Sequence, residues 1–417
     1  MAPSVHCLPM LLQQPPCMTT DVDLLILGGG CAGLSLAWRL SELGDNCPTV
    51  LILDKRTHYC NDRTWCFWDN HDARIDNLIE HQWRWLGLTS PMKKVQFDCG
   101  RNAYQMLAAS SFYSRALQAV RSCPAISLSL GQAVVSEPIH GPSGWTMPSD
   151  AGPITARMVV DTRPQGVPAA GGATLWQSFY GQEVSCEAEV FGPDAAELMD
   201  FGAGVDVKGD VNADGQIPFT YVLPISKHRA LVEATVFGPL PLGRAALSAQ
   251  LDAAVNRYTA GNAFSTLRSE SGVLPMGLVR KPPSLGAGYV AVGVMAGGAR
   301  PSSGFAFQRI QQWADQCCAA IAAGGVPTSH RRDPPLVRMM DQLFLQVLRA
   351  QPQAAPALFL SLFERADSAC VIRFLSGKST VWDCLQVMKA LPAKHFIQQL
   401  LPSPPARLAS RARASTR

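Results

Sequence analysis

The chain has 417 residues and a net charge of +4, and 16% of its residues are charged. This length fits two domains or one large domain with an insertion, and the charged fraction lies below the ~25% of typical soluble proteins. The composition excludes a coiled coil, an acidic disordered chain and a collagen-like repeat, and the small, dispersed charge gives no indication of nucleic-acid binding.

The two ends of the chain differ in composition from the rest. Residues 1–20 hold no Lys or Arg and an apolar run broken by Pro, unlike a secretory signal, so we predict a disordered extension with Met18 as the native start. Residues 401–417 form a basic tail, a composition that attracts anionic lipid headgroups. No run approaches the ~18 apolar residues of a membrane-spanning helix. The 13 cysteines and 8 histidines lack metal-ligand spacing, so we expect reduced thiols, no metal and a cytoplasmic location.

Apolar periodicity predicts strands and helices in an order typical of an α/β protein. Short apolar runs predict strands at 24–27, 50–53, 158–160, 221–223, 230–235 and 289–294. Helical spacing predicts helices at 31–43, 107–121, 244–258, 305–323, 335–350 and 381–389. We therefore predict the fold class α/β, with a Rossmann-type cofactor domain, an antiparallel-sheet substrate region and a helical C-terminal part.

A glycine-rich turn follows the first predicted strand. Its pattern is Gly28-x-Gly30-x-x-Gly33, and Asp54 closes the second strand. Gly28 permits the tight turn, Gly30 lets the backbone approach a pyrophosphate, and Gly33 lets the helix pack on the strand. The helix N-terminus offers free N–H groups to the phosphates. Asp54 can accept hydrogen bonds from ribose hydroxyls and disfavours a 2′-phosphate, so the unit predicts FAD or NAD rather than NADP.

A second glycine-rich segment, between a predicted strand and a predicted helix, favours FAD. It resembles the strand–loop–helix that hydroxylase-type flavoproteins place against the ribitol and pyrophosphate. On this resemblance we assign Gly293, Gly298, Ser303 and Gly304 to the flavin. Those flavoproteins have Gly-Asp where this chain has Gly293-Val294, so its flavin contacts must differ.

A more specific pattern begins at 61–68, Asn-Asp-Arg-Thr-Trp-Cys-Phe-Trp. Six further segments follow in collinear order: Leu198-Met-Asp-Phe201, Phe219-x-Tyr221-x-Leu-Pro224, Leu231-Val-Glu233-Ala-Thr235, Glu270-x-Gly272-x-x-Pro275, Gly298-x-Arg-Pro-Ser-Ser-Gly-Phe-Ala-Phe307 and Arg373-Phe-Leu-Ser-Gly377. Together with the first glycine motif, they resemble the bacterial lycopene β-cyclases, flavoproteins that form carotenoid rings. The resemblance covers residues 21 to about 392.

The resemblance implies a redox-neutral reaction on lycopene and other linear carotenoids. A ψ-end is protonated, the carbocation closes a β-ring and a proton is lost, giving γ-carotene and then β-carotene. It also implies reduced FAD as the working cofactor, with NADH or NADPH as the electron source. Because the substrate is a membrane-dissolved hydrocarbon, the enzyme is expected to associate peripherally with the membrane surface. The oligomeric state, the choice between one and two ring closures and the exclusivity for β-rings stay open.

The patterns and the resemblance together predict five parts of the chain. These are the extension at 1–20, an FAD-binding domain at 21–175 and 265–330, a β-rich substrate-binding region at 176–264, a helical region at 331–400 and the tail at 401–417.

Glu233 is the first candidate for the catalytic acid. It lies in an apolar strand between Val232 and Ala234, and apolar surroundings raise the pKa of a carboxyl group, which suits protonation of an alkene. The family motif often has a second acid where this chain has Ala234. Asp200 and Glu270 are further catalytic candidates for placing or shielding the cation, with a structural cap or ion pair as the alternative.

The segment after Asp54 supplies further candidates. Arg63 is a candidate for binding a cofactor phosphate. The aromatic candidates for the polyene channel, each with core packing as the alternative, are Trp65, Trp68, Phe191, Phe201 and Phe305.

Two other functions fit the same pattern. The first is an FAD-dependent redox enzyme, a monooxygenase or isoprenoid reductase, which would consume NAD(P)H with every turnover. The second is a non-catalytic protein that binds isoprenoids, against which the position of Glu233 in an apolar strand argues.

Overall fold

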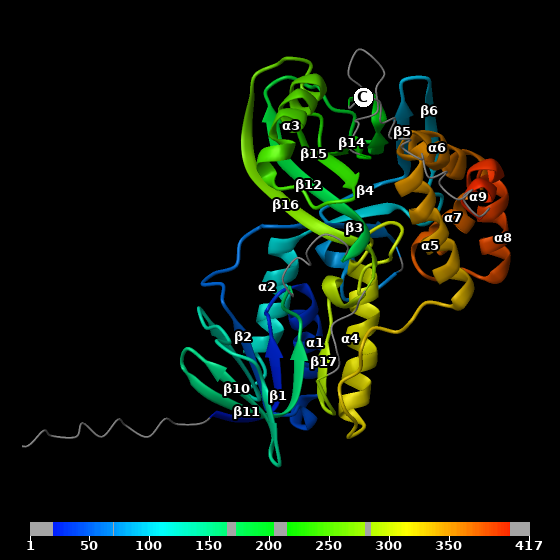
Figure 1. Cartoon of the computed structure of the whole chain (residues 1–417). Helices are drawn as coiled ribbons and strands as arrows, with labels where there is room; N and C mark the ends of the chain where they lie inside the picture. The colour runs from blue at the N-terminus through cyan, green and yellow to red at the C-terminus, as the bar shows by residue number, and fades with distance from the viewer. Residues whose placement is uncertain (1–19, 70, 165–171, 204–214, 280–284, 401–417) are drawn as a thin grey trace, which may run out of the picture.

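The structure is a computed structural model that describes residues 20–69, 71–164, 172–203, 215–279 and 285–400 (Figure 1). The predicted N-terminal extension, apart from Thr20, and the basic tail lie outside these residues. Across the described ranges, no helix combines the length and the apolar character needed to cross a bilayer.

The first sheet carries the glycine-rich turn and lies in the lower part of Figure 1. Its strand order is β8-β2-β1-β11-β10-β9, with β17 beside β11. The five parallel strands are β1 (Thr20–Leu27), β2 (Val50–Asp54), β8 (Ile126–Leu130), β11 (Gly152–Asp161) and β17 (Tyr289–Ala291). The antiparallel strands are β9 (Ile139–Gly141) and β10 (Gly144–Ser149).

Helices cover one face of this sheet, which explains why its central strands are apolar throughout. Residues 24–27 of β1 are fully buried, as expected for a parallel strand covered on both faces. The covering helices are α1 (Cys31–Ser41), α2 (Ala109–Arg121) and α4 (Phe307–Ala322). Trp145 and Met147 of β10 pack against the opposite face.

The second sheet is antiparallel except for one pair and lies above the first in Figure 1. Its order is β16-β12-β15-β14-β13-β5-β6. The strands are β5 (Trp85–Ser90), β6 (Lys93–Asp98), β12 (Ala173–Cys186), β13 (Ala195–Asp200), β14 (Ile217–Pro224), β15 (Arg229–Gly238) and β16 (Phe264–Leu278). The helix α3 (Arg244–Tyr258) packs against β12 and β15 on one face.

Five C-terminal helices lie beside the second sheet, at the right of Figure 1. They are α5 (Pro335–Ala350), α6 (Ala355–Arg365), α7 (Ser368–Leu375), α8 (Val381–Ala390) and α9 (Ala393–Leu400). Pro335 at the first position of α5 and the Thr380–Asp383 capping box of α8 fix where these helices begin. A small sheet of β3 (Thr64–Trp68), β7 (Tyr104–Ala108) and β4 (His81–Trp83) completes the fold.

The predicted fold class is confirmed: an α/β cofactor sheet, an antiparallel sheet and a helical C-terminal part are all present. The strand membership differs from the predicted boundaries at two places. β5 and β6 lie within the predicted range 21–175 but belong to the second sheet, because β5 pairs in parallel with β13. β16 lies within the predicted range 265–330, apart from its first residue, but pairs with β12 of the second sheet.

Candidate active site

The first glycine-rich turn has the shape expected of a dinucleotide site. Gly28 has φ +96°, and a Cβ there would lie 2.6 Å from Oγ1 of Thr162. A Cβ on Gly33 would lie 2.0 Å from the carbonyl oxygen of Gly28, so this glycine allows α1 to pack on the turn. A Cβ on Gly30 would meet only Nη2 of Arg56, at 3.8 Å. The space beside Gly30 is therefore open for a bound group, as a pyrophosphate requires.

Asp54 fastens this turn from the end of β2. Its Oδ2 accepts a hydrogen bond from the N–H of Gly29 at 2.6 Å, and its Oδ1 accepts one from the N–H of Arg56 at 2.8 Å. The Tyr59 hydroxyl donates to the carbonyl of Gly29 at 2.9 Å. The contact of Asp54 with a ribose hydroxyl stays a prediction. The sequence analysis missed Arg56 and Tyr59, whose signal is their position just past the carboxyl end of a parallel strand.

The second glycine-rich segment divides between two surroundings. Gly293 donates its N–H to Nε2 of His330 at 2.9 Å, and a Cβ on Gly298 would lie 2.7 Å from the same nitrogen. These two glycines therefore surround His330. Ser303 and Gly304 instead line the cavity described below, and among the described residues the buried Ser303 hydroxyl has no hydrogen-bond partner. A buried hydroxyl without a protein partner fits a site that holds a polar ligand.

A buried ion pair joins this segment to the C-terminal helices. Arg300 is fully buried, donates from Nη2 to Oδ1 of Asp341 at 3.0 Å and lies 4.1 Å above the ring of Phe374. The Ser302 hydroxyl donates to the same carboxylate oxygen at 2.7 Å. Burial raises the pKa of Asp341, and the Arg300 guanidinium opposes that shift. The loop before α4 is therefore held in place by α5.

A cavity of about 760 Å³ lies between the second sheet, residues 302–307 and the C-terminal helices. Alternate residues of β12, β14 and β15 face it, because successive strand residues point to opposite sides, and residues 270 and 272–274 of β16 also line it. Its apolar wall includes Phe179, Phe219, Leu231, Phe237, Leu274 and Phe359. The sheet thus presents an apolar surface that is interrupted by a few polar groups.

Two of these polar groups are carboxyl groups on either side of one glycine. Gly181 of β12 lies opposite Glu233 of β15 and opposite Glu270 of β16. Residues opposite each other in a sheet share a face, so both carboxyl groups point into the cavity with no side chain between them. A Cβ on Gly181 would come within 3.3 Å of Cβ and Cγ of Glu233. Because Gly181 has no side chain, the space between the two acids stays open.

The surroundings of Glu233 favour its protonated form. Its side chain is 7% exposed, and one oxygen accepts a hydrogen bond from the Thr235 hydroxyl at 2.9 Å. Burial raises the pKa of Glu233 to about 8, and the negative charge of Glu270 adds to the rise. Glu233 can therefore give up a proton inside an apolar cavity.

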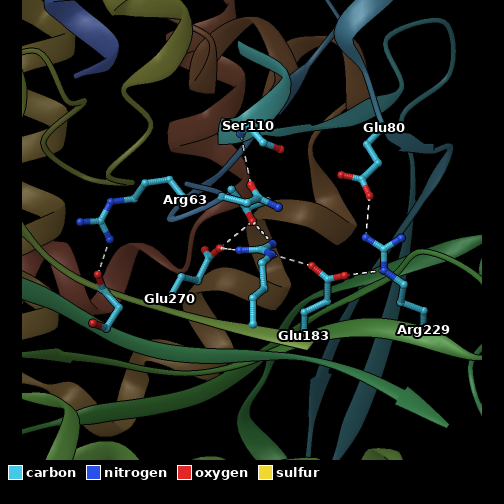
Figure 2. A network of polar contacts seen from close by, with 10 residues as sticks. Arg63, Glu80, Ser110, Glu183, Arg229 and Glu270 are labelled. Carbon is cyan, nitrogen blue, oxygen red and sulfur yellow. Dashed lines mark hydrogen bonds and ion pairs between the residues drawn. The ribbon is translucent and has the colours of Figure 1, made fainter. Parts of the chain in front are cut away.

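Glu270 lies at the inner end of a series of ion pairs (Figure 2). Its Oε2 accepts a hydrogen bond from the Thr64 hydroxyl at 2.7 Å and pairs with Nη1 of Arg268. From the cavity outward, the series runs through Glu270, Arg268, Glu183, Arg229 and Glu80. The series alternates three carboxylates with two guanidiniums, and Glu270 is its member that lines the cavity.

The sequence analysis missed Arg268, although it lies two positions before Glu270 and therefore on the same face of the same strand. It also gave no role to Tyr221, which lies opposite Glu233 on β14, although Tyr221 stands in one of the quoted motifs. The Tyr221 and Tyr104 hydroxyls lie 3.1 Å apart. Burial raises the pKa of both tyrosines well above the ordinary value, so both are neutral at the cavity wall.

The structure corrects the prediction for Asp200. This residue is buried but does not line the cavity. Its Oδ2 accepts hydrogen bonds from the Tyr258 hydroxyl at 2.6 Å and from Arg257, so it ties β13 to α3. Its Oδ1 also accepts a hydrogen bond from the N–H of Gly202 at 2.8 Å, so the cap or ion-pair alternative describes Asp200.

Some of the aromatic candidates line the cavity and the others pack in the core behind it. Trp65 and Phe305 line the cavity, as the channel prediction expects. Trp68 packs behind Phe305, with ring centroids 5.0 Å apart, and Phe201 packs behind the lining residue Phe219 at 5.8 Å. Phe191 lies on the opposite face of the sheet, in the core beneath α3, because the chain leaves β12 on that side. The channel prediction is therefore corrected for Trp68, Phe201 and Phe191.

Arg63 lines the cavity at its exposed edge. Its guanidinium donates to the main-chain oxygen of Ser271 on β16. The guanidinium beside the glycine turn is that of Arg56, and the phosphate contact of Arg63 stays a prediction. Among the residues that the structure describes, no group of His, Cys, Asp and Glu side chains could hold a metal ion.

Comparison with known families decides what this site belongs to. The sequence profile described as "Lycopene cyclase protein" matches residues 23–400. The chain belongs to the lycopene cyclase family. A lycopene beta-cyclase of Pseudescherichia vulneris is 24% identical over 396 residues, which cover 89% of this chain and 94% of that protein. The predicted family is confirmed, and the chain is an enzyme of the carotenoid-cyclase type.

Solved structures share the fold of this lycopene cyclase family member. A geranylgeranyl bacteriochlorophyll reductase-like protein of Thermoplasma acidophilum matches with a TM-score of 0.57 and 12% identity, over 92% of this chain and 98% of that protein. The p-nitrophenol 4-monooxygenase of Pseudomonas putida matches with a TM-score of 0.56 and 13% identity, over 92% of this chain and 97% of the monooxygenase. At these identities the likeness concerns the fold alone.

Proposed function

We propose that this chain is a lycopene β-cyclase that converts the ψ-ends of lycopene to β-rings, giving γ-carotene and then β-carotene. The observation that carries the proposal is the pair of acids, Glu233 and Glu270, on either side of Gly181 in the apolar cavity. A pKa of about 8 leaves roughly nine in ten Glu233 side chains protonated at pH 7. Glu270 forms an ion pair with Arg268.

Each acid has a distinct task in this proposal. Glu233 donates its proton to the terminal double bond of the polyene, which leaves a tertiary carbocation. The nearby double bond attacks that carbon and closes the ring. Loss of one ring proton to a carboxylate then completes the isomerisation, so one proton is gained and one is lost, with no net transfer of electrons. The Glu270 carboxylate, at the cavity wall, stabilises the cation while the surrounding apolar side chains exclude water.

We infer FAD as the cofactor, held at the first glycine turn and at residues 303–304. The open space at Gly30, the α1 N-terminus without an acidic first turn and the unpartnered Ser303 hydroxyl fit a pyrophosphate at one end and a polar ring edge at the other. When bound in its reduced form, the flavin supplies negative charge near the cation without net electron transfer, and NADH or NADPH provides its electrons.

Pigment analysis of cells that accumulate lycopene tests the proposal. Expression of this chain is expected to convert lycopene to γ- and β-carotene. Expression of Glu233→Gln at equal protein level is expected to leave lycopene unchanged, and Glu189→Gln, on an exposed turn, is the matched control. Unchanged lycopene with a folded, flavin-containing protein would refute the cyclase and favour the redox enzyme, which consumes NAD(P)H in proportion to product.

The proposal includes peripheral association with the membrane surface, since lycopene and other linear carotenoids dissolve in the bilayer rather than in water.

A further inference from the structure

Both α8 and α9 carry large apolar side chains that are exposed to solvent. On α8, Val381, Trp382 and Leu385 are 68%, 66% and 47% exposed. On α9, Ile397 and Leu400 are 55% and 69% exposed. We call these five residues the C-terminal apolar face; both helices lie at the outer right edge of Figure 1.

The face is not the ordinary solvent side of an amphipathic helix. The core side of α8 already buries Cys384, Val387 and Ala390. The residues Val381, Trp382 and Leu385 follow one another at spacings of one and three, so they form a second apolar stripe on the same helix. An apolar stripe that points to solvent marks a surface with a partner.

The cavity opens beside this face. Met388 of α8 and Met339 of α5 both line the cavity, yet they are 40% and 55% exposed. A residue that faces both the cavity and the solvent lies at the mouth. Leu391 and Phe396, just before and within α9, line the cavity as well and are half-buried. The mouth is therefore bordered by the same helices that carry the apolar face.

The exposed charged side chains of α8, α9 and the residues next to them are positive. Between residues 376 and 400 the charged side chains are Lys378, Lys389, Lys394 and Asp383. The three lysines are exposed, whereas Asp383 is fully buried, caps α8 and pairs with Arg373. An apolar stripe bordered by lysines complements a bilayer with anionic headgroups. A second copy of this chain would instead bring the same lysines together.

We propose that the C-terminal apolar face docks on an anionic lipid bilayer and sets the cavity mouth against it, so that the carotenoid passes from the lipid into the cavity without crossing water. This inference rests on the proposed function for the nature of the substrate. The docking itself rests only on the exposed side chains, the mouth and the lysines.

Vesicle flotation without any carotenoid tests the docking. The flavin-loaded protein is mixed with vesicles of phosphatidylcholine alone, or of phosphatidylcholine with phosphatidylglycerol. We expect binding that is stronger to the anionic vesicles. Since burial of one large apolar side chain is worth about tenfold or more, the double variant Trp382→Asp/Leu385→Asp is expected to bind about a hundredfold more weakly.

Matched variants identify the cause. Leu240→Asp/Leu267→Asp changes two residues of similar exposure, 53% and 54%, outside the C-terminal helices and is expected to bind normally. Lys389→Gln/Lys394→Gln is expected to lose the preference for anionic vesicles. Equal binding by wild type and Trp382→Asp/Leu385→Asp would overturn the proposal. The proposal would also be overturned if binding were lost only when Arg407, Arg411, Arg413 and Arg417 are changed to Gln. A wild-type dimer that Trp382→Asp/Leu385→Asp converts to a monomer would likewise overturn it.

A second assay separates this inference from the cyclase proposal. With lycopene in vesicles, Trp382→Asp/Leu385→Asp is expected to lose product formation in step with binding. With lycopene in detergent micelles the variant is expected to keep forming product, because neither Trp382 nor Leu385 lines the cavity. If that variant were as active as the wild type on lycopene in vesicles, the proposed entry of the carotenoid from the bilayer through the cavity mouth would be refuted. No cyclisation by wild type in either form would refute the cyclase and leave the vesicle-binding result standing.

Discussion

The spacing of the two acids makes a quantitative prediction for Glu270→Gln. Glu233 and Glu270 lie on strands that flank β12, so their backbones are two strand spacings apart, about 10 Å. Two unit charges at that distance interact by roughly 1.5–2 kcal/mol at an effective dielectric constant of about 20. Removing the charge of Glu270 should therefore lower the pKa of Glu233 by about one pH unit.

The sign follows from the role of Glu233. It acts in its protonated form, so the rate of cyclisation falls as the pH rises through its pKa, about 8 in the wild type. In Glu270→Gln the rate of cyclisation is expected to fall near pH 7, because lowering the pKa of Glu233 by about one unit makes it ionise at lower pH. The maximal rate should also fall, since the cation loses its anionic neighbour.

The assay follows γ- and β-carotene by chromatography across this pH range, with lycopene in vesicles and the flavin kept reduced. Glu189→Gln serves as the control, because its carboxylate pairs with Lys227 on an exposed turn and does not line the cavity. If the alkaline limb of Glu270→Gln stays at the wild-type pH or moves upward, the two acids are not coupled as we argue.

Three further variants test separate parts of the site. Glu233→Gln should lower cyclisation by about 10²–10⁴-fold, the usual contribution of a general acid, while FAD absorbance of the purified protein is unchanged; near-normal β-carotene would exclude Glu233 as the acid. Gly30→Val should abolish FAD retention, because its side chain fills the open space beside the turn; a yellow protein after gel filtration would contradict this. Arg300→Met leaves Asp341 buried without its partner and should destabilise the protein by about 3–5 kcal/mol in denaturant unfolding at neutral pH; an unchanged midpoint would show that Asp341 finds another partner.

Local patterns carried most of what the sequence could predict. The glycine turn and the strands around it lie within 35 residues of one another, so spacing alone identified β1, α1 and β2. Glu233 stood out because a lone acid in an apolar strand is unusual. The family resemblance supplied Glu270, whose motif gave no indication of its ion-pair partners.

The remaining features depend on contacts between distant segments. Asp200 and Phe191 lie in segments whose faces are set only when β13 and β12 enter the sheet, so neither could be placed from its neighbours in sequence. The pairing of β5 with β13 joins residues more than a hundred positions apart, and no local signal predicts it. The exposed stripe of α8 was missed because an apolar helix residue looks the same in sequence whether it faces the core or a bilayer.

The interleaving of the two sheets has a consequence for biogenesis. Strands β5 and β6 of the second sheet precede β8–β11 and β17 of the cofactor sheet in the chain. Strand β17 of the cofactor sheet follows the last strand of the second sheet, β16. Neither sheet can therefore close on a ribosome-bound fragment that ends near residue 175. Such a nascent chain exposes β5 without β13, a hydrogen-bonding edge open to aggregation until β13 (Ala195–Asp200) has emerged. Productive expression is expected to depend on chaperones that shield this edge, and a separately expressed cofactor half is expected to aggregate.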